Sequence, residues 1–375
     1  MSKPKAIVIG AGIVGLASAK ALAQKGFSVK VIERGSFASG ASVRNFGMIW
    51  PIGQPDGTLY ARALRSREVW KTISDTGAFW SDPVGSLHVA HHPKEWTVLQ
   101  ELYESFKADR PVKLLTAEQI AETNPAVGQT NLYGGLYNAD ELIVDPRLAI
   151  AALPAYLSEV YAVEFYWNKC VSYIADNTVY VGNEEDYEAD LIFICSGADF
   201  ETLYPEDFAR FPLTKCKLQM MRLIAQPDHW RIGPALCGGL SLIHYNSFKV
   251  ADSLTQLRGY YEAEMEQYLD WGIHVMACQN EAGEITIGDS HEYGNTHDAF
   301  DKAGINQMII DYLQKFTSFK DYTITESWNG VYPKLTNGDT ELFFSPESGV
   351  YVLNGLGGAG MTLSFGLAEE VVAGL

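Results

Sequence analysis

The sequence carries little positive charge and has no long apolar run. It contains 28 Lys and Arg against 46 Asp and Glu, which gives a formal net charge of −18 at pH 7. Nucleic acids and anionic membranes are bound by clustered lysine and arginine, so we expect neither as a partner. No stretch approaches the roughly 20 apolar residues that a transmembrane segment needs. The apolar run near the N-terminus is too short for a signal peptide, and we interpret it as mature structure.

Cysteine is scarce, and its spacing is not that of metal ligands. The five cysteines are Cys170, Cys195, Cys216, Cys237 and Cys278. An odd number without close pairs favours reduced thiols and a cytoplasmic protein. The only dense histidine stretch, "HVAHH" (residues 88–92), lacks an acidic or cysteine companion at a useful spacing. The sequence therefore predicts no metal site.

What is present is a globular, aromatic-rich composition. Hydrophobic residues make up 47% of the 375 residues, and there are 20 Tyr, 17 Phe and 8 Trp. This length allows two domains, or one large domain with an insertion. We find no internal repeat, low-complexity stretch or linker, which favours domains that interleave along the chain.

The first thirty residues have the pattern of a βαβ unit. Residues 5–10 are a β-branched run, residues 11–26 are helical with Gly26 as the stop, and residues 27–34 form a second strand. The strands of such a unit are parallel. Residues 36–65 are expected to be rich in loops.

The rest of the chain predicts a mixture of helices and strands. Helices are expected at 96–108, at 116–125 and from 145, where Asp145 is the N-cap and Pro146 the first helical residue. Residues 178–199 indicate a hairpin-like pair of strands, and the second, 190–197, is apolar throughout, as in a strand buried on both faces. The last segments predict strands over about 215–290, an amphipathic helix over 298–318, and a strand, glycine turn and helix over 349–375.

A glycine motif stands between the first strand and the first helix. Gly10, Gly12 and Gly15 form G-x-G-x-x-G, in which the glycines allow a tight turn, close approach of a pyrophosphate and close packing of helix on strand. The helix N-terminus offers N–H groups to the phosphates. Glu33 ends the next strand, where a carboxylate accepts ribose hydroxyls, and this disfavours a 2′-phosphate. The motif therefore favours FAD or NAD over NADP, with a glycine turn in an unrelated βα unit as the alternative.

The remainder of the chain favours FAD over NAD. An NAD dehydrogenase continues as βαβαβ, whereas this chain breaks after "VIERG" (residues 31–35) into a loop of small and polar residues, "SFASGASVRNFGMIW". Further small-residue turns follow in "ADLIFICSGAD" and "NGLGGAGMT". Three such turns, far apart in the sequence, suit a long and extended cofactor.

These segments together resemble the D-amino acid oxidase superfamily of FAD-dependent oxidoreductases, which includes glycine oxidase and monomeric sarcosine oxidase. The resemblance runs nearly end to end through "VIGAGIVGLASAKALAQKGFSVKVIER", "SGASVRNFGM", "DPRLAIAAL", "ADLIFICSGA", "GVYPKLTNGD" and "NGLGGAGMTLSFGLAEEVV". It implies an α/β fold, with a Rossmann-like FAD-binding domain interleaved with an α+β substrate domain on a mainly antiparallel sheet. We expect residues 1–85, 146–214 and 325–375 in the first domain, and residues 86–145 and 215–324 in the second.

The resemblance also implies which residues contact FAD. They lie in the first glycine turn, the loop after the second strand, the start of a strand near 171, the two later turns, and one strand position near 330. The set is Gly10, Ala11, Gly12, Ile13, Val14, Gly15, Glu33, Arg34, Ala41, Ser42, Arg44, Asn45, Gly47, Met48, Val171, Ser196, Gly197, Gly330, Gly355, Gly357, Gly358, Ala359, Gly360, Met361 and Thr362. The helix after the last turn directs its N-terminus toward developing negative charge on the flavin.

The chain departs from the family where the substrate is held. The arginine that grips the substrate carboxylate in D-amino acid and glycine oxidases is replaced by Tyr332, with Lys334 two residues later. The flavin-linking cysteine of sarcosine oxidases corresponds to Gly330, so we expect noncovalent FAD. Two lysines of those enzymes, one for oxygen activation and one for the carboxylate, correspond to Thr286 and Thr362. The departures put in question both the reaction with O2 and the usual grip on a carboxylate.

Other residues are therefore candidates for the catalytic site. They are Arg44, Met48, His291, Tyr332 and Lys334, with Arg258 as a further cation. Each has an ordinary alternative: Arg44 contacts only the cofactor, Met48 packs against the flavin, His291 is a structural hydrogen-bonding residue and Lys334 is solvated in a turn. Tyr260, Tyr261 and Trp271 form either an aromatic pocket or part of the core.

The activity implied is hydride transfer to flavin from the carbon beside an amine, giving an imine that hydrolyses. The substrate is a small anionic amine, either an amino acid or an aminophosphonate, since a missing carboxylate arginine fits a differently shaped anion. The electron acceptor is O2 or another carrier. The alternative is a flavin-binding subunit or regulatory protein without turnover of its own.

Overall fold

The N-terminal βαβ unit forms as the sequence predicts. In the computed structural model, which describes residues 3–182 and 185–375, β1 (Lys5–Ile9) pairs in parallel with β2 (Ser28–Glu33), and α1 (Ile13–Gln24) connects them. Gly26 follows α1 with a φ of +103°, a conformation that glycine adopts without steric cost. The turn between β1 and α1 thus lies at the carboxyl end of a parallel strand.

Around this unit is a six-stranded sheet in the order β20-β21-β13-β1-β2-β9. Its other strands are β9 (Glu164–Trp167), β13 (Leu191–Ile194), β20 (Leu342–Glu347) and β21 (Val350–Asn354). All the pairs are parallel except that of β20 with β21. Both faces are buried, since Ala6 and Val8 of β1 belong to one core cluster and Ile7 and Ile9 to another.

Helices cover one face of this sheet, and a small sheet covers the other. The first face packs against α1, α2 (Thr58–Ser74), α5 (Pro146–Tyr161) and α10 (Gly360–Ala373). The second packs against β10 (Val171–Ala175), β11 (Thr178–Val181) and β12 (Glu185–Glu188), and against the segment with α6 (Pro205–Phe208). Asp145 caps α5 as expected, because its side chain accepts from the backbone N–H groups of Arg147 and Leu148.

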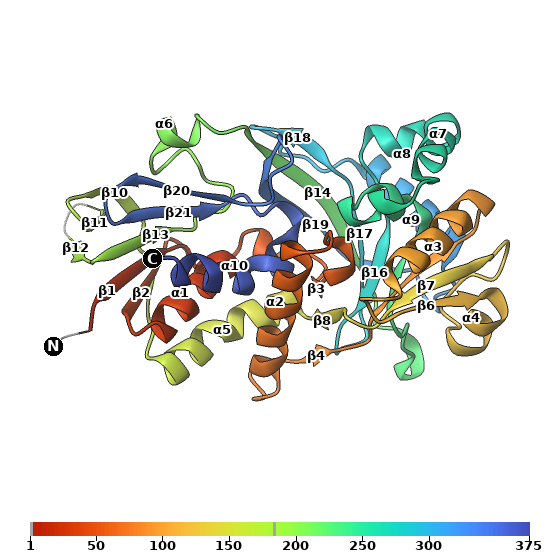
Figure 1. The fold of residues 1–375 in the computed structure, drawn as a ribbon, viewed down its shortest axis with the longest axis horizontal. Helices are drawn as coiled ribbons and strands as arrows, with labels where there is room; N and C mark the ends of the chain where they lie inside the picture. Colours follow the sequence, from red (N-terminus) through yellow and green to blue (C-terminus); the bar gives the residue numbers. More distant parts are fainter. Residues whose placement is uncertain (1–2, 183–184) are drawn as a thin grey trace.

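A nine-stranded sheet forms the other half of the molecule (Figure 1). Its path is β18-β14-β17-β16-β15-β5-β7-β6, with β19 paired to β14, and only the β5–β15 pair is parallel. The strands are β5 (Ser86–Ala90), β6 (Val112–Thr116), β7 (Gly134–Asn138), β14 (Leu213–Leu223), β15 (Ala235–Cys237), β16 (Met276–Gln279), β17 (Ile285–Gly288), β18 (Glu292–Gly294) and β19 (Ile324–Leu335). The helices of this half are α3 (Pro93–Phe106), α4 (Ala117–Thr123), α7 (Leu254–Glu264), α8 (Glu266–Asp270) and α9 (Ala303–Phe316).

A three-stranded sheet lies between the two halves. It consists of β3 (Met48–Ile49), β4 (Ser81–Asp82) and β8 (Leu142–Val144). Met48 packs into the core of the nine-stranded half, whereas Ile49 packs into that of the six-stranded half. The two cores are therefore joined through a strand that directly follows the small-residue loop.

The fold class is as expected, α/β with a mainly antiparallel second sheet, but three local predictions were wrong. Residues 36–65 include the start of α2, a long helix that the sequence reading missed. The stretch 240–251, expected as a strand, forms two 3-10 turns, and α7 and α8 follow it, so Tyr260 and Tyr261 lie on a helix. The hairpin is formed by β11 and β12, while β13 belongs to the six-stranded sheet.

Tertiary packing explains these differences. The helix α2 is polar on average and is held by a buried face that includes Trp70, whose indole N–H donates to the Met361 carbonyl at 2.8 Å. Local periodicity gives little warning of such a helix. In the described residues, none of the helices has the length and apolar character to cross a membrane.

Candidate active site

The first glycine turn is shaped by close backbone contacts. Gly10 has a φ of +104°, and a Cβ atom there would lie 2.4 Å from the Cys195 carbonyl oxygen. A Cβ atom on Gly15 would lie 1.9 Å from the Gly10 carbonyl oxygen. The N–H of Ile13 donates to Ser42 Oγ at 2.9 Å, which ties the start of α1 to the loop after β2. Only glycine permits this approach of helix to strand, as the motif predicts.

Glu33 lies beside that turn at the end of β2. Its carboxylate accepts from the N–H of Ala11 at 2.9 Å and from the N–H of Gly35 at 2.8 Å. The carbonyl oxygen of Glu33 accepts from Lys169, which brings the segment before Val171 to the same place. Arg34 pairs with Asp199 at 2.6 Å. The predicted ribose and adenine contacts thus lie together, although they come from three segments.

Two further turns meet the first at the same edge of the six-stranded sheet. The side chain of Asn354, at the end of β21, donates to the Gly197 carbonyl at 3.0 Å and to Ser196 Oγ at 3.4 Å. The Asn354 side-chain oxygen accepts from Gly355 at 2.8 Å. A Cβ atom on Gly360, the first residue of α10, would lie 3.6 Å from Ile13 in α1. The N-termini of α1 and α10 are therefore neighbours.

This arrangement fits an extended dinucleotide. Three turns after parallel strands meet at one sheet edge, and two helix N-termini lie side by side there, which is where such folds bind dinucleotides. In the described part of the chain, Gly10, Gly12, Gly357 and Gly360 are half-buried, so that backbone groups remain accessible to a ligand.

The loop over residues 41–48 leads from this edge to the second half of the molecule. Asn45 folds the loop, since its side chain donates to the carbonyls of Ala41 and Ser42 and accepts from the N–H of Gly47 at 2.7 Å. Met48 is buried on β3. Arg44 is exposed, and its guanidinium donates to the Asn329 carbonyl at 3.1 Å. The loop is thereby attached to β19.

One face of β19 carries Gly330, Tyr332 and Lys334 toward these loops. A Cβ atom on Gly330 would lie 3.4 Å from Arg44 Cβ, one on Gly358 would lie 3.6 Å from Tyr332 Oη, and one on Gly357 would lie 4.0 Å from Lys334 Cγ. Tyr332 is buried in a small cluster with Cys216, Leu218 and Met220, against which Ala41 and Phe46 pack. The face therefore lies beside both predicted flavin-contacting segments.

Burial dominates the electrostatics of this face. It raises the pKa of the Tyr332 hydroxyl well above its ordinary value, with Cys216 and Asp289 adding to the effect. Lys334 is half-buried, and its ammonium group donates to Tyr293 Oη at 2.9 Å. Tyr332 is thus a neutral hydrogen-bonding group at neutral pH, and Lys334 carries the positive charge.

Two cysteines that are distant in the sequence lie near the predicted flavin contacts. Cys216 is directly opposite Tyr332 in the β14–β19 ladder, and Cys278 Sγ lies 3.0 Å from the Phe46 carbonyl oxygen. Neither is near position 330 in the sequence, which corresponds to the flavin-linking cysteine of sarcosine oxidases. Burial raises the pKa of Cys216 to about 11, so its thiol is a poor nucleophile at neutral pH. Noncovalent FAD remains a prediction.

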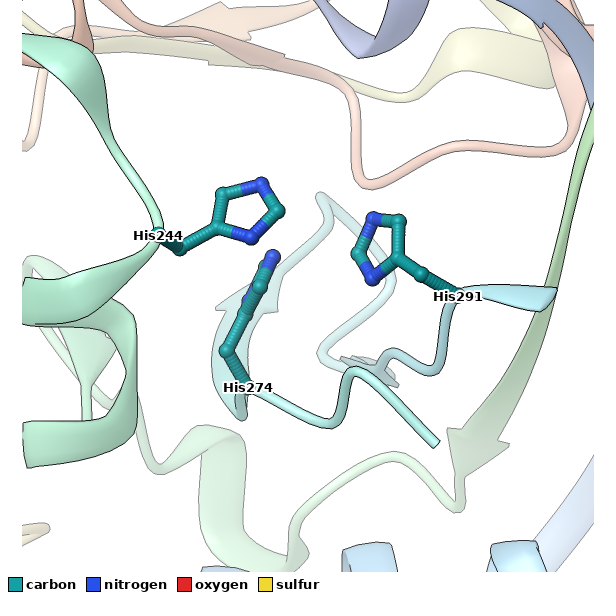
Figure 2. Close-up of side chains that lie close together, drawn as sticks. All are labelled: His244, His274 and His291. Carbon is teal, nitrogen blue, oxygen red and sulfur yellow. The ribbon is translucent and has the colours of Figure 1, made fainter. Parts of the chain in front are cut away.

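Next to Lys334 the structure brings together three histidines, of which the sequence analysis named only one. His244, His274 and His291 offer ring nitrogens that all lie within 4.8 Å of one another (Figure 2). The three residues come from the first 3-10 turn after β15, the segment before β16 and the segment between β17 and β18. Their separations of 30 and 17 residues give no recognisable local spacing. Only the fold reveals the cluster.

The remaining candidates take other positions. Arg258 lies on α7 and donates to the carbonyl of Ile243, the residue before His244, at 3.1 Å. Thr286 is buried on β17 next to Arg222, and the Thr362 hydroxyl accepts from the N–H of Trp50 at 2.9 Å. Neither threonine replaces the positive charge of a lysine.

The histidines of residues 88–92 are dispersed. His88 is buried beside Trp50 and Phe248, the ring of His91 contacts the Gly128 carbonyl, and His92 caps α3. Burial lowers the pKa of His88 to about 3. These three side chains have structural surroundings and do not converge.

A family model described as FAD dependent oxidoreductase (DAO) matches residues 5–373. Among solved structures, the fold is similar to glycine oxidase from Geobacillus kaustophilus, with a TM-score of 0.77 and 19% identity over 100% of this chain and 95% of that one. It is also similar to L-proline dehydrogenase from P. horikoshii, with a TM-score of 0.78, 21% identity and coverage of 99% and 92%. A third similar structure is iminodiacetate oxidase from Chelativorans sp. BNC1, with a TM-score of 0.73 and 19% identity over 99% of this chain and 94% of that one.

Curated relatives match over shorter stretches. The bifunctional protein MnmC of tRNA 5-methylaminomethyl-2-thiouridine biosynthesis from Burkholderia ambifaria is 31% identical over 143 residues, which are 35% of this chain and 21% of that protein. The protein of the same name from Nitrosospira multiformis is 25% identical over 256 residues, a match that covers 62% of this chain and 38% of that protein. The matched part thus spans well under half the length of these relatives.

Proposed function

Because the chain belongs to the DAO family of FAD-dependent oxidoreductases, we propose that it oxidises the C–N bond of a small anionic amine, either an amino acid or an aminophosphonate. The protein is an enzyme, and FAD is its cofactor. When bound, FAD supplies a hydride acceptor for the carbon beside the amine, and the imine that leaves is hydrolysed by water. The protein's part is to bind the amine, orient it and exclude water.

The observation that carries the proposal is the position of Lys334. It lies on the same face of β19 as Tyr332, next to the last glycine turn, and its ammonium group is held by Tyr293 at 2.9 Å. A half-buried lysine beside the predicted flavin edge binds an anionic group with a charge-assisted hydrogen bond. This position supports an anionic substrate that is gripped without the family's arginine.

Neighbouring side chains complete the proposed site. Tyr332 presents a neutral hydroxyl, Met48 packs where the flavin ring is expected, and Arg44 is held toward β19 through the Asn329 carbonyl. His291 stacks on Tyr293, the residue that Lys334 contacts. In hydride transfer from a neutral amine, positioning and desolvation carry most of the catalysis, so no strong acid or base is needed.

The names of the similar proteins support the substrate class. Glycine oxidase, L-proline dehydrogenase and iminodiacetate oxidase act on compounds that combine an amine with a carboxylate, as their names state. The tRNA-modifying relatives suggest a second substrate, a modified tRNA base. The net charge of −18 disfavours that reading, because tRNA phosphates require a basic surface.

The test is anaerobic reduction of the bound flavin. The purified FAD protein is mixed with glycine, sarcosine, D-alanine, 2-aminoethylphosphonate or its N-methyl derivative, and the visible absorbance of the flavin is followed. We expect one class, carboxylate or phosphonate, to bleach the flavin, while an amine of equal length that lacks the acidic group does not. Air is then admitted, and rapid return of the absorbance identifies O2 as an acceptor, whereas slow return indicates another carrier.

If none of these amines bleaches the flavin of a folded, fully loaded protein, the proposal fails. The alternative of a flavin-binding subunit without turnover would then take its place.

A further inference from the structure

The histidine cluster has the compactness of a coordination site. The ring centroids of His244 and His274 are 3.8 Å apart, those of His244 and His291 4.9 Å, and those of His274 and His291 5.1 Å. Figure 2 shows the three rings reaching a common space from three separate segments. Two of the residues, His274 and His291, are buried, whereas His244 lies on the exposed side. The cluster therefore has a closed side and an open side.

Polar atoms in this cluster lack partners. Among the described residues, the His274 side chain is only 4% exposed, and neither of its buried ring nitrogens makes a hydrogen bond. Asp289 Oδ1 is also buried and accepts no hydrogen bond. A buried polar group without a partner costs free energy, and native structures rarely leave several of them in one place. Their concentration at one point indicates a bound group that satisfies them.

The orientation of His291 identifies the kind of group. Its Nδ1 lies 2.9 Å from the Gly272 carbonyl oxygen, which can only accept, so Nδ1 carries the proton. The other nitrogen, Nε2, then has a free lone pair. A histidine that donates one N–H to a carbonyl and presents the other nitrogen is the usual arrangement of a metal ligand.

Asp289 lies near His274 without a hydrogen bond to it. Its carboxylate Oδ1 lies 3.4 Å from His274 Nε2, and its Oδ2 lies 3.9 Å from His291 Nε2. A carboxylate behind a histidine holds the proton on the nearer nitrogen and leaves the farther one as the ligand. For His274 this leaves Nδ1 free. Two lone pairs and an accepting carboxylate at such short range favour a cation between or beside them.

We propose that His244, His274 and His291 bind one divalent transition-metal ion of the Zn²⁺ type, with a coordination position left open on the side of His244. Imidazole nitrogens are preferred ligands of Zn²⁺ and its neighbours, and three histidines with an open fourth position form an established kind of Zn²⁺ site. Metal–nitrogen bonds of about 2.0–2.1 Å require the rings to move closer than they are, by small rotations about the side-chain bonds. The exposed His244 has the room to do so.

A second positive charge lies near the cluster. Tyr293, which accepts from Lys334, stacks at a ring-centroid distance of 6.3 Å from His291. A metal ion beside an ammonium group is stabilised when an anion lies between them. Resting on the proposed function, the inference is that the anionic end of the amine occupies this open position.

A pocket that holds the anion without a metal is the competing interpretation. It would use the histidines as N–H donors. The orientation of His291 disfavours this interpretation, because its Nε2 would present a lone pair to the anion. The nearby carboxylate of Asp289 disfavours it as well, because it would repel an anion. A direct measurement of metal binding distinguishes the two interpretations.

Metal binding is measured on the full-length FAD protein after treatment with a chelator. ZnCl₂ is titrated by calorimetry, metal content is determined after gel filtration, and CoCl₂ is added to look for a visible band of tetrahedral Co²⁺. We expect one ion per chain. His244→Asn, at the exposed ligand, should weaken binding by at least about 10- to 100-fold, and His229→Asn, an exposed histidine in the 3-10 turn Pro227–His229, should not.

Absence of stoichiometric binding to the wild type would overturn the proposal, as would equal binding by the two variants. Inorganic phosphate that binds the metal-free wild type but not His244→Asn would overturn it in favour of the anion pocket. Because His244 is exposed, that variant is expected to fold, and retained flavin absorbance checks this.

The role of the metal in substrate binding is tested separately by anaerobic flavin reduction. We expect the amine concentration for half-maximal reduction to fall about tenfold when Zn²⁺ is restored. An unchanged value in a protein that binds Zn²⁺ would overturn this role and leave the metal site standing. If the protein binds Zn²⁺ but no amine reduces the flavin, the proposed function fails and the metal site does not.

Discussion

The two ends of the proposed site differ in the kind of group that they offer to a ligand. At the cofactor end, the proposed contacts are backbone groups of glycine turns, and the side chains of Glu33 and Asn354 hold those turns in place. At the substrate end, the proposed contacts are side chains, which come from β19, from the loop over residues 41–48 and from the three segments that carry the histidines. Cofactor binding at the first end therefore depends on the backbone conformation, whereas substrate binding at the second end depends on the identity of the side chains.

This difference determines what a substitution changes. Adding atoms to a glycine turn displaces backbone and should remove the cofactor altogether. Exchanging a side chain at the substrate end should alter affinity for the amine while the flavin stays bound. The predictions below test that division.

The largest effect is expected for Gly15→Ala. The new Cβ atom would lie 1.9 Å from the Gly10 carbonyl oxygen, so α1 must move away from β1 and from the phosphates. We expect FAD affinity to fall by more than about 100-fold, measured by flavin fluorescence on titration of the apoprotein. Gly259→Ala, in α7 where a Cβ meets no atom within 4 Å, is the matched control. A variant that retains full FAD would remove the backbone argument for the cofactor end.

A buried carboxyl in the second half should give the next largest effect. Glu141 is fully buried, accepts from the N–H of Ile52, from Ser86 and from Asn138, and burial raises its pKa to about 7, with a smaller contribution from Asp140. The folded state therefore holds a proton that the unfolded state loses above its lower pKa, near 4.5. Stability is greatest below that value and falls as the pH rises toward 7.

For Glu141→Gln this pH dependence should disappear. Between pH 5 and 7 the wild type should lose about 2 kcal/mol more than the variant, as measured by denaturant unfolding at each pH. Parallel curves for the two proteins would show that Glu141 titrates as it does in the unfolded chain.

Lys334→Met should separate substrate binding from cofactor binding. Removing the ammonium group beside the last glycine turn should raise the amine concentration for half-maximal flavin reduction about tenfold, because one charge-assisted hydrogen bond is lost. FAD content should stay unchanged. Lys249→Met, an exposed lysine in the turn Asn246–Val250, controls for loss of charge. Loss of FAD with unchanged amine binding would reverse the assignment of Lys334.

The smallest effect is expected for Asn354→Ala. The amide joins the turns after β13 and β21 through Gly197, Ser196 and Gly355. Without it the turns are less well ordered, and FAD affinity should fall about fivefold, with the amine dependence unaltered. Asn337→Ala, in the turn between β19 and β20, is the comparison. Equal FAD affinities would show that strand pairing alone orders the turns.

The same division explains what the sequence could predict. The first glycine turn and the cap at Asp145 are local patterns with a local physical cause, and the structure forms them as predicted. Glu33 ends β2 beside that turn, and its contact with ribose remains a prediction. Helix α2 was missed because a tertiary contact, Trp70 to Met361, contributes to holding it. His244 and His274 were missed because ladder pairing and loop packing bring them to His291, and no spacing in the chain records that. The residue roles assigned by resemblance remain predictions.

The continuity of β19 has a consequence for how such an enzyme changes its substrate. A single strand runs from the nine-stranded sheet to Lys334, which bridges to Leu356 at the last glycine turn. Its alternate positions, Gly330, Tyr332 and Lys334, share the face toward the cofactor loops, while Val331 and Pro333 face the other way. Under the proposed function, exchanging the side chains of Tyr332 and Lys334 would therefore change the head group that is accepted, while the register of the strand keeps their backbone positions fixed beside the cofactor loops.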